Sequence, residues 1–322
     1  MTGPRIHCVI LNWRTPDMTL RALDAAQAAM DGLPGGITVV DNDSGDGSED
    51  RLRATIADMP RVRVVQSGRN GGFGAGNNHA IRAGLPDGPA DLIYILNSDA
   101  FPDARAIHAL RDHLAAHPAA GLAGSLIVGE DGVPHLTTFR FPSIASEFEG
   151  AARFGPISRL LRHRAVPVPT PDHARPVDWL AGASLMVRAD VLSEIGLFDE
   201  GFFLYFEETD LCRRAAAAGW ETHFVPDSRV VHVGSASTGM KEWAETPDYW
   251  FASRRRYFTK ARGPVHASLA TLAHIAGGAI HRARCALTGR RPADPPRFLR
   301  RLIAQEWGPA PRAPHHTESP PA

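Results

Sequence analysis

Residues 37–48 read ITVVDNDSGDGS. Four apolar or β-branched residues lead to the carboxylate of Asp41, and a turn rich in Asp, Asn and Gly follows. Ser48 then supplies a residue type favoured at the start of a helix. The pattern predicts a strand over 37–41 and a helix over 48–57, which is the repeating unit of a parallel α/β sheet.

The same alternation runs through the first 130 residues. Further strands are predicted over 6–11, 62–66, 92–96 and 121–128, and further helices over 16–30, 76–83 and 103–116. We therefore expect right-handed βαβ units and a mainly parallel sheet flanked by helices. Ligands of such sheets bind beyond the carboxyl ends of the strands, where this chain places Asn12, Asp41 and Asp99.

The second half of the chain is less regular. Residues 130–178 are Pro-rich and are expected to form an irregular segment on the acceptor side of a site. A buried segment is predicted over 179–187, and a pair of strands over 221–225 and 229–233. The pattern of 243–262 predicts a basic amphipathic helix, and the last dozen residues are expected to be disordered.

Charge is distributed unevenly along the 322 residues, although the formal net charge is zero. From Trp250 onward there are 13 Lys and Arg against 3 Asp and Glu, a net +10, which leaves −10 for the first 249 residues. Aromatic residues flank the basic run 254–256. Such a tail is typical of contact with an anionic surface, either a membrane or the acidic body itself.

Cysteine usage and hydropathy bear on the compartment. Cys8, Cys212 and Cys285 match no metal or redox spacing, as expected in a reducing compartment. The N-terminal residues lack the features of a signal peptide, and no apolar run reaches the ~18 residues that span a bilayer. We expect a cytoplasmic protein, peripheral on the inner face of the plasma membrane if the tail binds lipid.

Three carboxylates, Glu207, Glu208 and Asp210, lie within four residues and directly follow an aromatic run. Apolar surroundings disfavour ionised carboxylates, so the cluster fits a pocket wall holding a group that accepts a proton. The simpler interpretation is a helix start, where acidic residues interact favourably with the helix dipole. The residues alone leave both open.

Other single residues also allow two interpretations. Asp41 can accept from the imide N–H of a pyrimidine base, or can belong to a turn formed for backbone reasons, in which it is freer than residues 46–48. Asp99 can hold a divalent cation that bridges phosphates, or can cap the helix that follows it. His232 is a lone histidine, of interest only if the fold brings it to Asp99.

A glycine-rich loop, NGGFGAGNN, occupies residues 70–78. Such a loop before a helix allows close approach of a ligand and suits a diphosphate. It fails the dinucleotide-binding spacing, because Asn77 occupies the third glycine position and the loop follows the third strand. A nicotinamide-dependent oxidoreductase is therefore disfavoured.

In combination these features resemble the inverting family-two glycosyltransferases of the GT-A fold, and among them the bacterial rhamnosyltransferase-like group, over residues 5–262. The resemblance rests on five motifs in order: residues 11–13, 40–44, 70–77, 97–99 and 198–214, followed by Pro226 and His232. It implies a Rossmann-like α/β domain over 1–240, with a nucleotide-sugar half (1–130) and an acceptor half (131–240). A basic helical extension with a disordered tail would occupy 241–322.

The resemblance also implies site residues. The donor-side positions are Asn12, Asp41, Asp43, Asn70, Gly72, Phe73, Asn77, Asn97 and Asp99. The acceptor-side positions are Trp179, Gly182 and Ala183. Glu208 corresponds to the catalytic base, with Glu207 and Asp210 left as alternatives, and Asp99 and His232 correspond to ligands of Mg²⁺ or Mn²⁺. Asn97 replaces the first acid of the family's D-x-D element, and Glu208 replaces a commoner Asp.

The implied function is transfer of a sugar from a nucleoside-diphosphate sugar to a hydroxyl of a glycan or polyprenyl-linked acceptor, in cell-envelope or polysaccharide synthesis. Family likeness favours dTDP-rhamnose as donor, and no nucleic-acid partner is expected. A rival from another class is a non-catalytic GT-A-like subunit that only binds sugar nucleotide or glycan. The intact acidic cluster, Asp99 and His232 argue against that rival.

Overall fold

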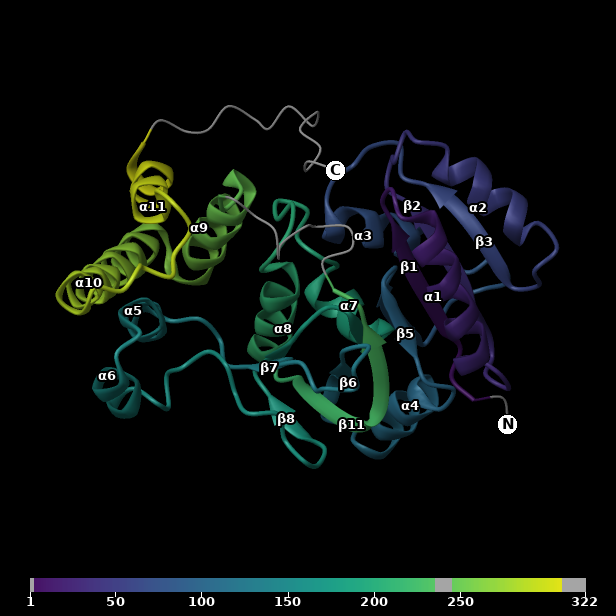
Figure 1. Cartoon of the computed structure of the whole chain (residues 1–322). Coiled ribbons are helices and arrows are strands. Elements are labelled where there is room, and N and C mark those ends of the chain that lie inside the picture. Colours follow the sequence, from purple (N-terminus) through teal and green to yellow (C-terminus); the bar gives the residue numbers. More distant parts are fainter. Residues whose placement is uncertain (1–2, 235–244, 309–322) are drawn as a thin grey trace. The chain divides into compact units, whose positions relative to one another are not determined.

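The computed structural model describes residues 3–234 and 245–308. These residues form two compact units (Figure 1). The sheet unit comprises described residues of 1–139, 169–203 and 207–238, and the helical unit comprises those of 140–168, 204–206 and 239–322.

A mixed nine-stranded sheet organises the sheet unit, in the order β3-β2-β1-β4-β10-β6-β11-β5, with β8 paired to β11. The strands are β1 (Ile6–Asn12), β2 (Gly35–Asp41), β3 (Val62–Gln66), β4 (Leu92–Asn97), β5 (Ala100–Pro102), β6 (Ala120–Val128), β8 (Arg175–Val177), β10 (Ser184–Arg188) and β11 (Glu221–His232). Strands β3, β2, β1 and β4 are parallel, and β7 (Thr138–Phe139) pairs with β9 (Trp179–Leu180) in a small second sheet. The five strands predicted in the first 130 residues are all present.

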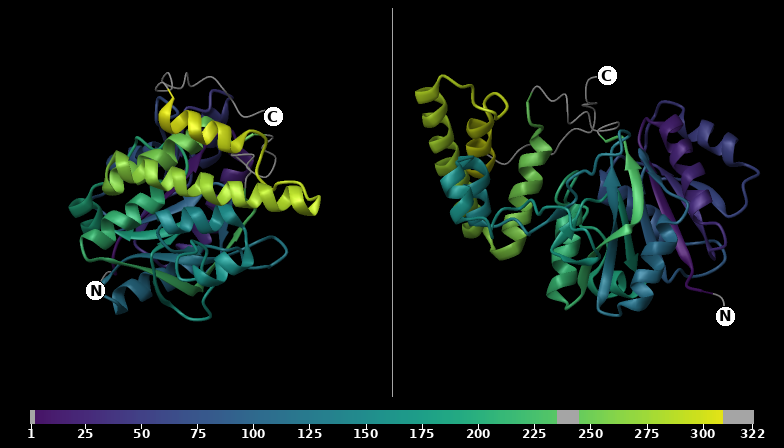
Figure 2. Two further views of the ribbon diagram at one scale, coloured as in Figure 1. Left: turned by 90° about the vertical axis from the view of Figure 1, so that its left-hand side faces the viewer. Right: turned by 60° about the horizontal axis from the view of Figure 1, so that its bottom comes forward.

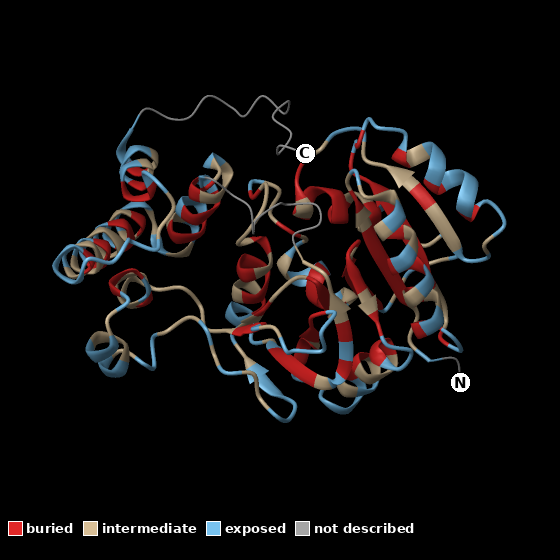
Figure 3. Ribbon diagram, in the orientation of Figure 1, coloured by how far each residue is buried: buried red, intermediate tan, exposed pale blue. Residues whose placement is uncertain are grey.

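Helices pack against this sheet and bury its apolar side chains (Figure 3). They are α1 (Pro16–Ala29), α2 (Ser48–Ile56), α3 (Phe73–Ala83), α4 (Ala106–Ala116), α7 (Ala189–Ile195) and α8 (Glu207–Ala217). Strands β1 and β4 are buried almost throughout, as expected for strands with neighbours on both sides and helices on their faces. The expected α/β architecture, a mostly parallel central sheet flanked by helices, is confirmed.

Two sequence-based boundaries were wrong. Helix α3 begins at Phe73, three residues before the predicted start, because Phe73, Gly74 and Ala75 already adopt helical geometry. Residues 221–225 and 229–233 do not form a pair of strands. They belong to the single strand β11, whose register against β6 shifts between Val225 and Arg229 in an irregularity that bends the strand without reversing it.

The helical unit contains α5 (Ile144–Ala152), α6 (Gly155–Leu160), α9 (Asp248–Arg262), α10 (Pro264–Thr288) and α11 (Phe298–Trp307). Helix α10 packs against α5, α9 and α11. The expectation of an irregular segment over 130–178 was therefore wrong for α5 and α6, and α11 was not anticipated. The predicted helix over 243–262 is seen from Asp248 onward. Trp243 and the expected disordered tail lie outside the described residues.

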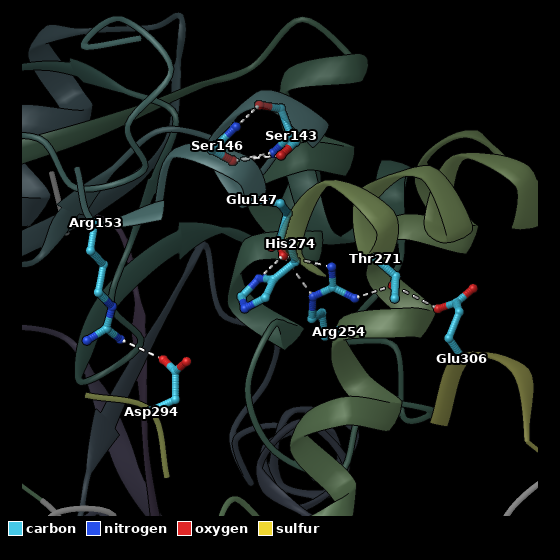
Figure 4. Close-up of polar contacts among 9 residues, drawn as sticks. All are labelled: Ser143, Ser146, Glu147, Arg153, Arg254, Thr271, His274, Asp294 and Glu306. Atoms are coloured by element: carbon cyan, nitrogen blue, oxygen red, sulfur yellow. Dashed lines mark hydrogen bonds and ion pairs between the residues drawn. The ribbon is translucent and has the colours of Figure 1, made fainter. Parts of the chain in front are cut away.

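A buried polar network links the helices of this unit (Figure 4). Arg254 donates to Glu147 Oε2 at 2.7 Å and to Thr271 Oγ1 at 2.9 Å, while His274 Nδ1 lies 2.8 Å from the same Glu147 oxygen. Arg254 is only 1% exposed. The interpretation of 254–256 as a lipid-facing basic run is thus wrong for Arg254, because Arg254 is buried in an ion pair with Glu147 of α5.

The aromatic residues beside that basic run are also mostly interior. Phe251, Tyr257 and Phe258 are each at most 1% exposed. Phe251 packs with Phe298, Leu299 and Leu302 in the core of the helical unit. Among the described residues, no helix has the length and apolar character needed to cross a bilayer.

Candidate active site

The carboxyl ends of three neighbouring strands converge in the sheet unit. Asn12, the last residue of β1, pairs in register with Asp41, the last residue of β2. On the other side of β1, Leu11 pairs with Asn97, the last residue of β4. The register therefore places three of the expected donor-side residues at one edge of the sheet.

Asp41 lies in a dense hydrogen-bonded cluster at this edge. Its Oδ1 accepts from Asn12 Nδ2 at 2.7 Å and Ser44 Oγ at 2.6 Å, and its Oδ2 accepts from Ser44 N at 3.1 Å and Gln66 Nε2 at 2.9 Å. Four donors occupy the roughly four lone-pair positions of a carboxylate. The expectation that Asp41 is freer than residues 46–48 was wrong, since both of its oxygens are occupied and two of the donors belong to Ser44.

The glycine-rich loop packs tightly between two parts of this edge. Gly72 has φ +87°, and a side chain there would collide with the carbonyl of Phe203, which accepts from Phe73 N at 3.0 Å. Gly76 lies equally close to Leu11 and Asn42. Glycine is therefore required at position 72 by its backbone conformation, and at position 76 because a side chain would collide with the side chains of Leu11 and Asn42. The loop joins the strand ends to the segment that precedes α8.

Two asparagines hold this loop in place. Asn70 Oδ1 accepts from Gly72 N and from Asn42 Nδ2, which closes a local turn. Asn78 donates to the carbonyl of Phe198 and accepts from its N–H, so the buried side chain clasps a segment 120 residues away. Asn77 donates to the carbonyl of Phe73, whereas its Oδ1 atom has no hydrogen-bond partner in the described part of the chain.

Glu207 and Glu208 open helix α8. Glu207 is buried, and its Oε2 atom has no hydrogen-bond partner within residues 3–234 and 245–308. Burial together with the neighbouring charge of Glu208 raises its pKa well above the ordinary value. Glu208 is half-buried, and burial raises its pKa to about 7, although the N–H groups of Glu208 and Thr209 favour the ionised form. A carboxyl group with a pKa near neutrality is suited to accept and release a proton.

Asp210 has a different environment from the two glutamates. It is fully buried and forms ion pairs with Arg213 at 3.0 Å and Arg214 at 2.8 Å. Arg214 also donates to the carbonyls of Ile195 and Leu197. Both oxygens of Asp210 are occupied in anchoring α8 to the preceding loop, which leaves the two glutamates as the better candidates for proton transfer.

The expected acceptor-side residues lie near Glu208. A Cβ atom added at Gly182 would lie 3.6 Å from the ring of Phe73 and 3.7 Å from Cβ of Glu208. Ala183 is buried beside it, and its carbonyl accepts from Asn97 N. Trp179 stacks on Phe139 with ring centroids 4.2 Å apart and an interplanar angle of 17°. Both rings are half-buried, so they offer an aromatic surface.

His232 lies beside Asp99 because β11 and β5, the strand that directly follows Asp99, are neighbours in the sheet. Strand β11 pairs antiparallel with β5, His232 opposite Ala100, and His232 Nε2 lies 3.0 Å from Asp99 Oδ1. Among the described residues, no group of three or more His, Cys, Asp or Glu side chains could hold a metal. A carboxylate and an imidazole are nevertheless suitable ligands for Mn²⁺. The buried Oδ1 of Asn97 lacks a hydrogen-bond partner among the residues that the structure describes. These residues fit a cation whose other ligands come from phosphates.

Unpartnered polar atoms gather at this edge of the sheet. Nine buried side-chain nitrogen or oxygen atoms have no hydrogen-bond partner among the described residues, and four of them belong to this region: Asn42 Oδ1, Asn77 Oδ1, Asn97 Oδ1 and Glu207 Oε2. Buried polar atoms are usually hydrogen-bonded, so such a concentration marks a place where a ligand or water completes the bonding.

Sequence reasoning missed several residues of this site. Gln66 donates to Asp41, Asn42 supports the glycine loop, and Asn78 clasps Phe198. Asn78 was visible as the last residue of the loop motif, but nothing in the sequence distinguishes it from Asn77. Asp43, expected on the donor side, is exposed and adopts φ 59°, a conformation that Asp tolerates better than most residues.

Comparisons with known proteins agree with this architecture. Residues 4–263 match the family model described as glycosyltransferase-like family 2. Over 220 residues, 64% of this chain and 69% of the relative, the chain is 32% identical to the N-acetylglucosaminyl-diphospho-decaprenol L-rhamnosyltransferase of Mycobacterium tuberculosis. It is 41% identical over 56 residues, 17% of this chain, to the rhamnosyltransferase WbbL of Escherichia coli, of which 21% is covered.

Among solved structures, the chain resembles the mannosyltransferase PcManGT of Pyrobaculum calidifontis, in complex with GDP-Man and Mn²⁺. The TM-score is 0.56 at 18% identity, over 90% of this chain and 77% of the other. It also resembles residues 1–349 of S. aureus TarS, with a TM-score of 0.52 at 12% identity over 88% and 74% of the two chains. These similarities confirm the GT-A fold.

Proposed function

This chain belongs to the glycosyltransferase-like family 2, in its rhamnosyltransferase-like group, and we propose that it is an inverting enzyme. It would transfer a hexose, rhamnose by preference, from a nucleoside-diphosphate sugar to a hydroxyl group. The observation that carries this proposal is the place of Glu208. A half-buried carboxyl group with a pKa near 7 lies beside Gly182 and the glycine-rich loop.

The donor would bind at the converging ends of β1, β2 and β4. The unpartnered oxygens of Asn42, Asn77 and Asn97 are available to hydroxyl or N–H donors of a nucleotide sugar. Asp41 would contribute to recognition of the base once Gln66 or Ser44 yields a hydrogen-bonding position, because its four positions are otherwise occupied. The asparagine-supported glycine loop allows close approach of the diphosphate.

Glu208 would act as the general base in a single displacement. Its carboxylate takes the proton of the acceptor hydroxyl while the hydroxyl oxygen forms a bond to the anomeric carbon. The bond from that carbon to the diphosphate oxygen breaks on the opposite side, and its electron pair stays with the nucleoside diphosphate. No covalent enzyme intermediate is required, so the product has inverted configuration. A positioned base typically contributes about 10²–10⁴-fold to the rate.

A divalent cation, Mn²⁺ or Mg²⁺, would be held by Asp99 and His232 with help from Asn97. When bound, such a cation stabilises negative charge on the departing diphosphate. The chain's own contribution is to orient the ligands. Pairing of β11 with β5 places His232 beside Asp99, and Val233 N donates to the carbonyl of Asp99.

The acceptor would lie on the side of Glu208 that carries Gly182, Ala183 and Trp179. The absence of a side chain at Gly182 leaves room beside the base, and the stacked rings of Trp179 and Phe139 offer a surface for a sugar ring. Since the mycobacterial relative acts on a decaprenol-linked sugar, we propose a polyprenyl-linked glycan as acceptor, reached by peripheral contact with a membrane.

A panel of nucleoside-diphosphate sugars tests the proposal. The purified chain is incubated with each donor, with Mn²⁺ or Mg²⁺, and with a short polyprenyl-diphosphate glycan, and the released nucleoside diphosphate is measured. We expect release with dTDP-rhamnose that depends on the acceptor and is lost in Glu208→Gln. The anomeric configuration of the product, read by NMR, decides between inversion and retention. Binding of donor without release by any member of the panel would favour a non-catalytic subunit.

A further inference from the structure

Helix α10 carries a long exposed face that is apolar. Val265, Leu269 and Leu272, spaced four and three residues apart, are 73%, 47% and 51% exposed. The same helical face continues through small apolar residues to Leu287, which is 87% exposed. Residues three and four apart share a helix face. Within α10, all of which is described, the only charged residues are Arg282 and Arg284, and neither interrupts the stretch from Val265 to Ala279.

Helix α11 extends this apolar face. The two helices lie side by side (Figure 2). Glu306 of α11 accepts from Ser268 and Thr271 of α10, and Leu299 packs against Gly278. The contacts show that α11 runs antiparallel to α10. Leu269 directly follows Ser268, and Leu272 directly follows Thr271, the two α10 residues that donate hydrogen bonds to Glu306.

The exposed residues of α11 occupy corresponding positions. Trp307 follows Glu306, and Ile303 follows the buried Leu302; they are 49% and 43% exposed. When two helices pack antiparallel, the residue that follows a contact residue in one helix faces the same side of the pair as the residue that follows a contact residue in the other. The exposed residues of both helices therefore form one surface. We call Val265, Leu269, Leu272, Ile303 and Trp307 the apolar face.

Basic side chains border the apolar face. Arg300 shares the exposed side of α11 with Ile303 and Trp307. Arg262 ends α9, two residues before α10 begins, and Arg290 and Arg291 follow α10; all four arginines are exposed. The described helical unit carries 17 Lys and Arg against 6 Asp and Glu, a net +11. An exposed apolar patch with a basic border has the chemistry of a surface that meets anionic headgroups and inserts apolar side chains between them.

We infer that the apolar face of α10 and α11 docks the protein on an anionic lipid bilayer. The helices lie in the plane of the interface, with Leu269, Leu272 and Trp307 among the acyl chains and the bordering arginines at the headgroups. The charge of the unit argues for this occupant over a second copy, because a net +11 on each copy would oppose self-association. This inference rests on the proposed function only for the reason to dock, which is to reach a polyprenyl-linked acceptor; the docking itself is argued from the surface of α10 and α11.

Vesicle sedimentation of the full chain tests the inference. The probes are vesicles of phosphatidylcholine alone and vesicles with phosphatidylglycerol added, each at low and high salt. We expect binding to the phosphatidylglycerol vesicles that weakens with salt. The double variant Leu269→Asp/Leu272→Asp should reduce it about tenfold or more, since two apolar side chains would no longer be buried. Arg300→Gln should lower affinity and the dependence on salt.

Leu160→Asp provides the matched control. Leu160 is a more exposed leucine of the helical unit, 80% accessible, but it belongs to α6 and not to the apolar face. Its replacement should leave vesicle binding unchanged. Equal loss in both variants, binding indifferent to lipid charge, or a dimer in solution that Leu269→Asp/Leu272→Asp dissociates would each overturn the inference.

A second measurement separates this inference from the proposed function. Release of nucleoside diphosphate in detergent, with a short-chain acceptor, does not need a bilayer, so the Leu269→Asp/Leu272→Asp variant should retain wild-type turnover there. If the wild type turns over but does not bind vesicles, docking is wrong and the enzymatic proposal stands. If it binds vesicles as expected but turns over no donor, docking stands and the enzymatic proposal is wrong.

Discussion

The Nε2 atom of His232 lies 3.0 Å from the Oδ1 atom of Asp99, although 133 residues separate them in the chain. A lone histidine in a strand is ordinarily a core residue, and His232 was of interest only if the fold brought it to Asp99. The antiparallel pairing of β11 with β5 does so. The juxtaposition supports the proposed role of both side chains as ligands of one cation, and that role can be tested directly.

Asp99→Asn should abolish the dependence of nucleoside-diphosphate binding on metal. The amide is a weaker ligand than the carboxylate, and we expect affinity for dTDP in Mn²⁺ to fall at least about tenfold, toward the value measured in chelator. Isothermal titration with and without Mn²⁺ measures this. Asp103→Asn is the control, because Asp103 is half-exposed and its side chain pairs with Arg229 at 3.5 Å. Equal affinity of the wild type in chelator and in metal would rule out the cation site.

Glu208→Gln should reduce kcat by about 10²–10⁴-fold while leaving the affinity for dTDP unchanged, because the amide cannot take the acceptor proton. Initial rates of nucleoside-diphosphate release and titration of dTDP give the two values. Glu207→Gln is the matched comparison, since the two acids are adjacent and both have raised pKa values. Near-normal turnover in Glu208→Gln with loss in Glu207→Gln would reassign the base.

The rate should depend on pH through Glu208. Since burial raises its pKa to about 7, the base is protonated below neutrality, and kcat/KM should rise with pH and level off above about pH 7. Stability should change in the opposite direction. Between the ordinary value near 4.5 and 7 the folded state binds more protons than the unfolded state, so the free energy of unfolding decreases as pH rises. Glu208→Gln should flatten both profiles.

The sequence was sufficient for the framework of the sheet unit, because the decisive signals there are local. The strand of residues 37–41 ends in Asp41 and leads through a glycine turn to Ser48, and the structure follows that order. The hydrogen-bond partners of Asp41 could not be predicted from local sequence in the same way. Two of its four donors belong to Asn12 and Gln66, 29 and 25 residues away, and their alignment depends on the register of three strands.

The helical unit shows the opposite case. Helix α5 begins with a capping box of Ser143 and Ser146, which lacks the Glu or Gln that usually signals this motif. Helix α11 follows Pro295 and starts after Arg297 in a left-handed conformation, with no local start signal. Both helices are stabilised by packing on α10, so their existence depends on contacts distant in the chain and not on local propensity.

Gly182→Ala should separate acceptor binding from donor binding. The added methyl group would meet Phe73 and Glu208 at ordinary contact distances of 3.6 and 3.7 Å, so we expect the fold to persist. Space beside the base would be reduced, and KM for the acceptor should rise several-fold while dTDP affinity is unchanged. Gly72→Ala is the contrasting variant and should fail to fold properly, because its methyl group would overlap the carbonyl of Phe203. Weakened dTDP binding in Gly182→Ala would place Gly182 on the donor side.

Arg254→Met should destabilise the helical unit without affecting the nucleotide site. Burial alone would raise the pKa of Glu147, but the charges of Arg254 and His274 outweigh it and lower the pKa to about 2. Removing one partner of a buried ion pair typically costs about 3–5 kcal/mol. Urea unfolding followed by far-UV circular dichroism measures the loss, and dTDP titration checks the sheet unit.

The pH dependence distinguishes loss of the ion pair from loss of packing. A carboxyl group whose pKa is depressed by folding contributes stability above its ordinary value near 4.5, and that contribution disappears as pH falls toward 2. The wild type should therefore lose stability steeply across this range, and Arg254→Met should lose less. The double variant Arg254→Met/Glu147→Gln should be more stable at pH 7 than Arg254→Met, since it no longer buries an uncompensated carboxylate. Parallel pH profiles for wild type and Arg254→Met would show that Arg254 acts by packing on Phe258 and not through Glu147.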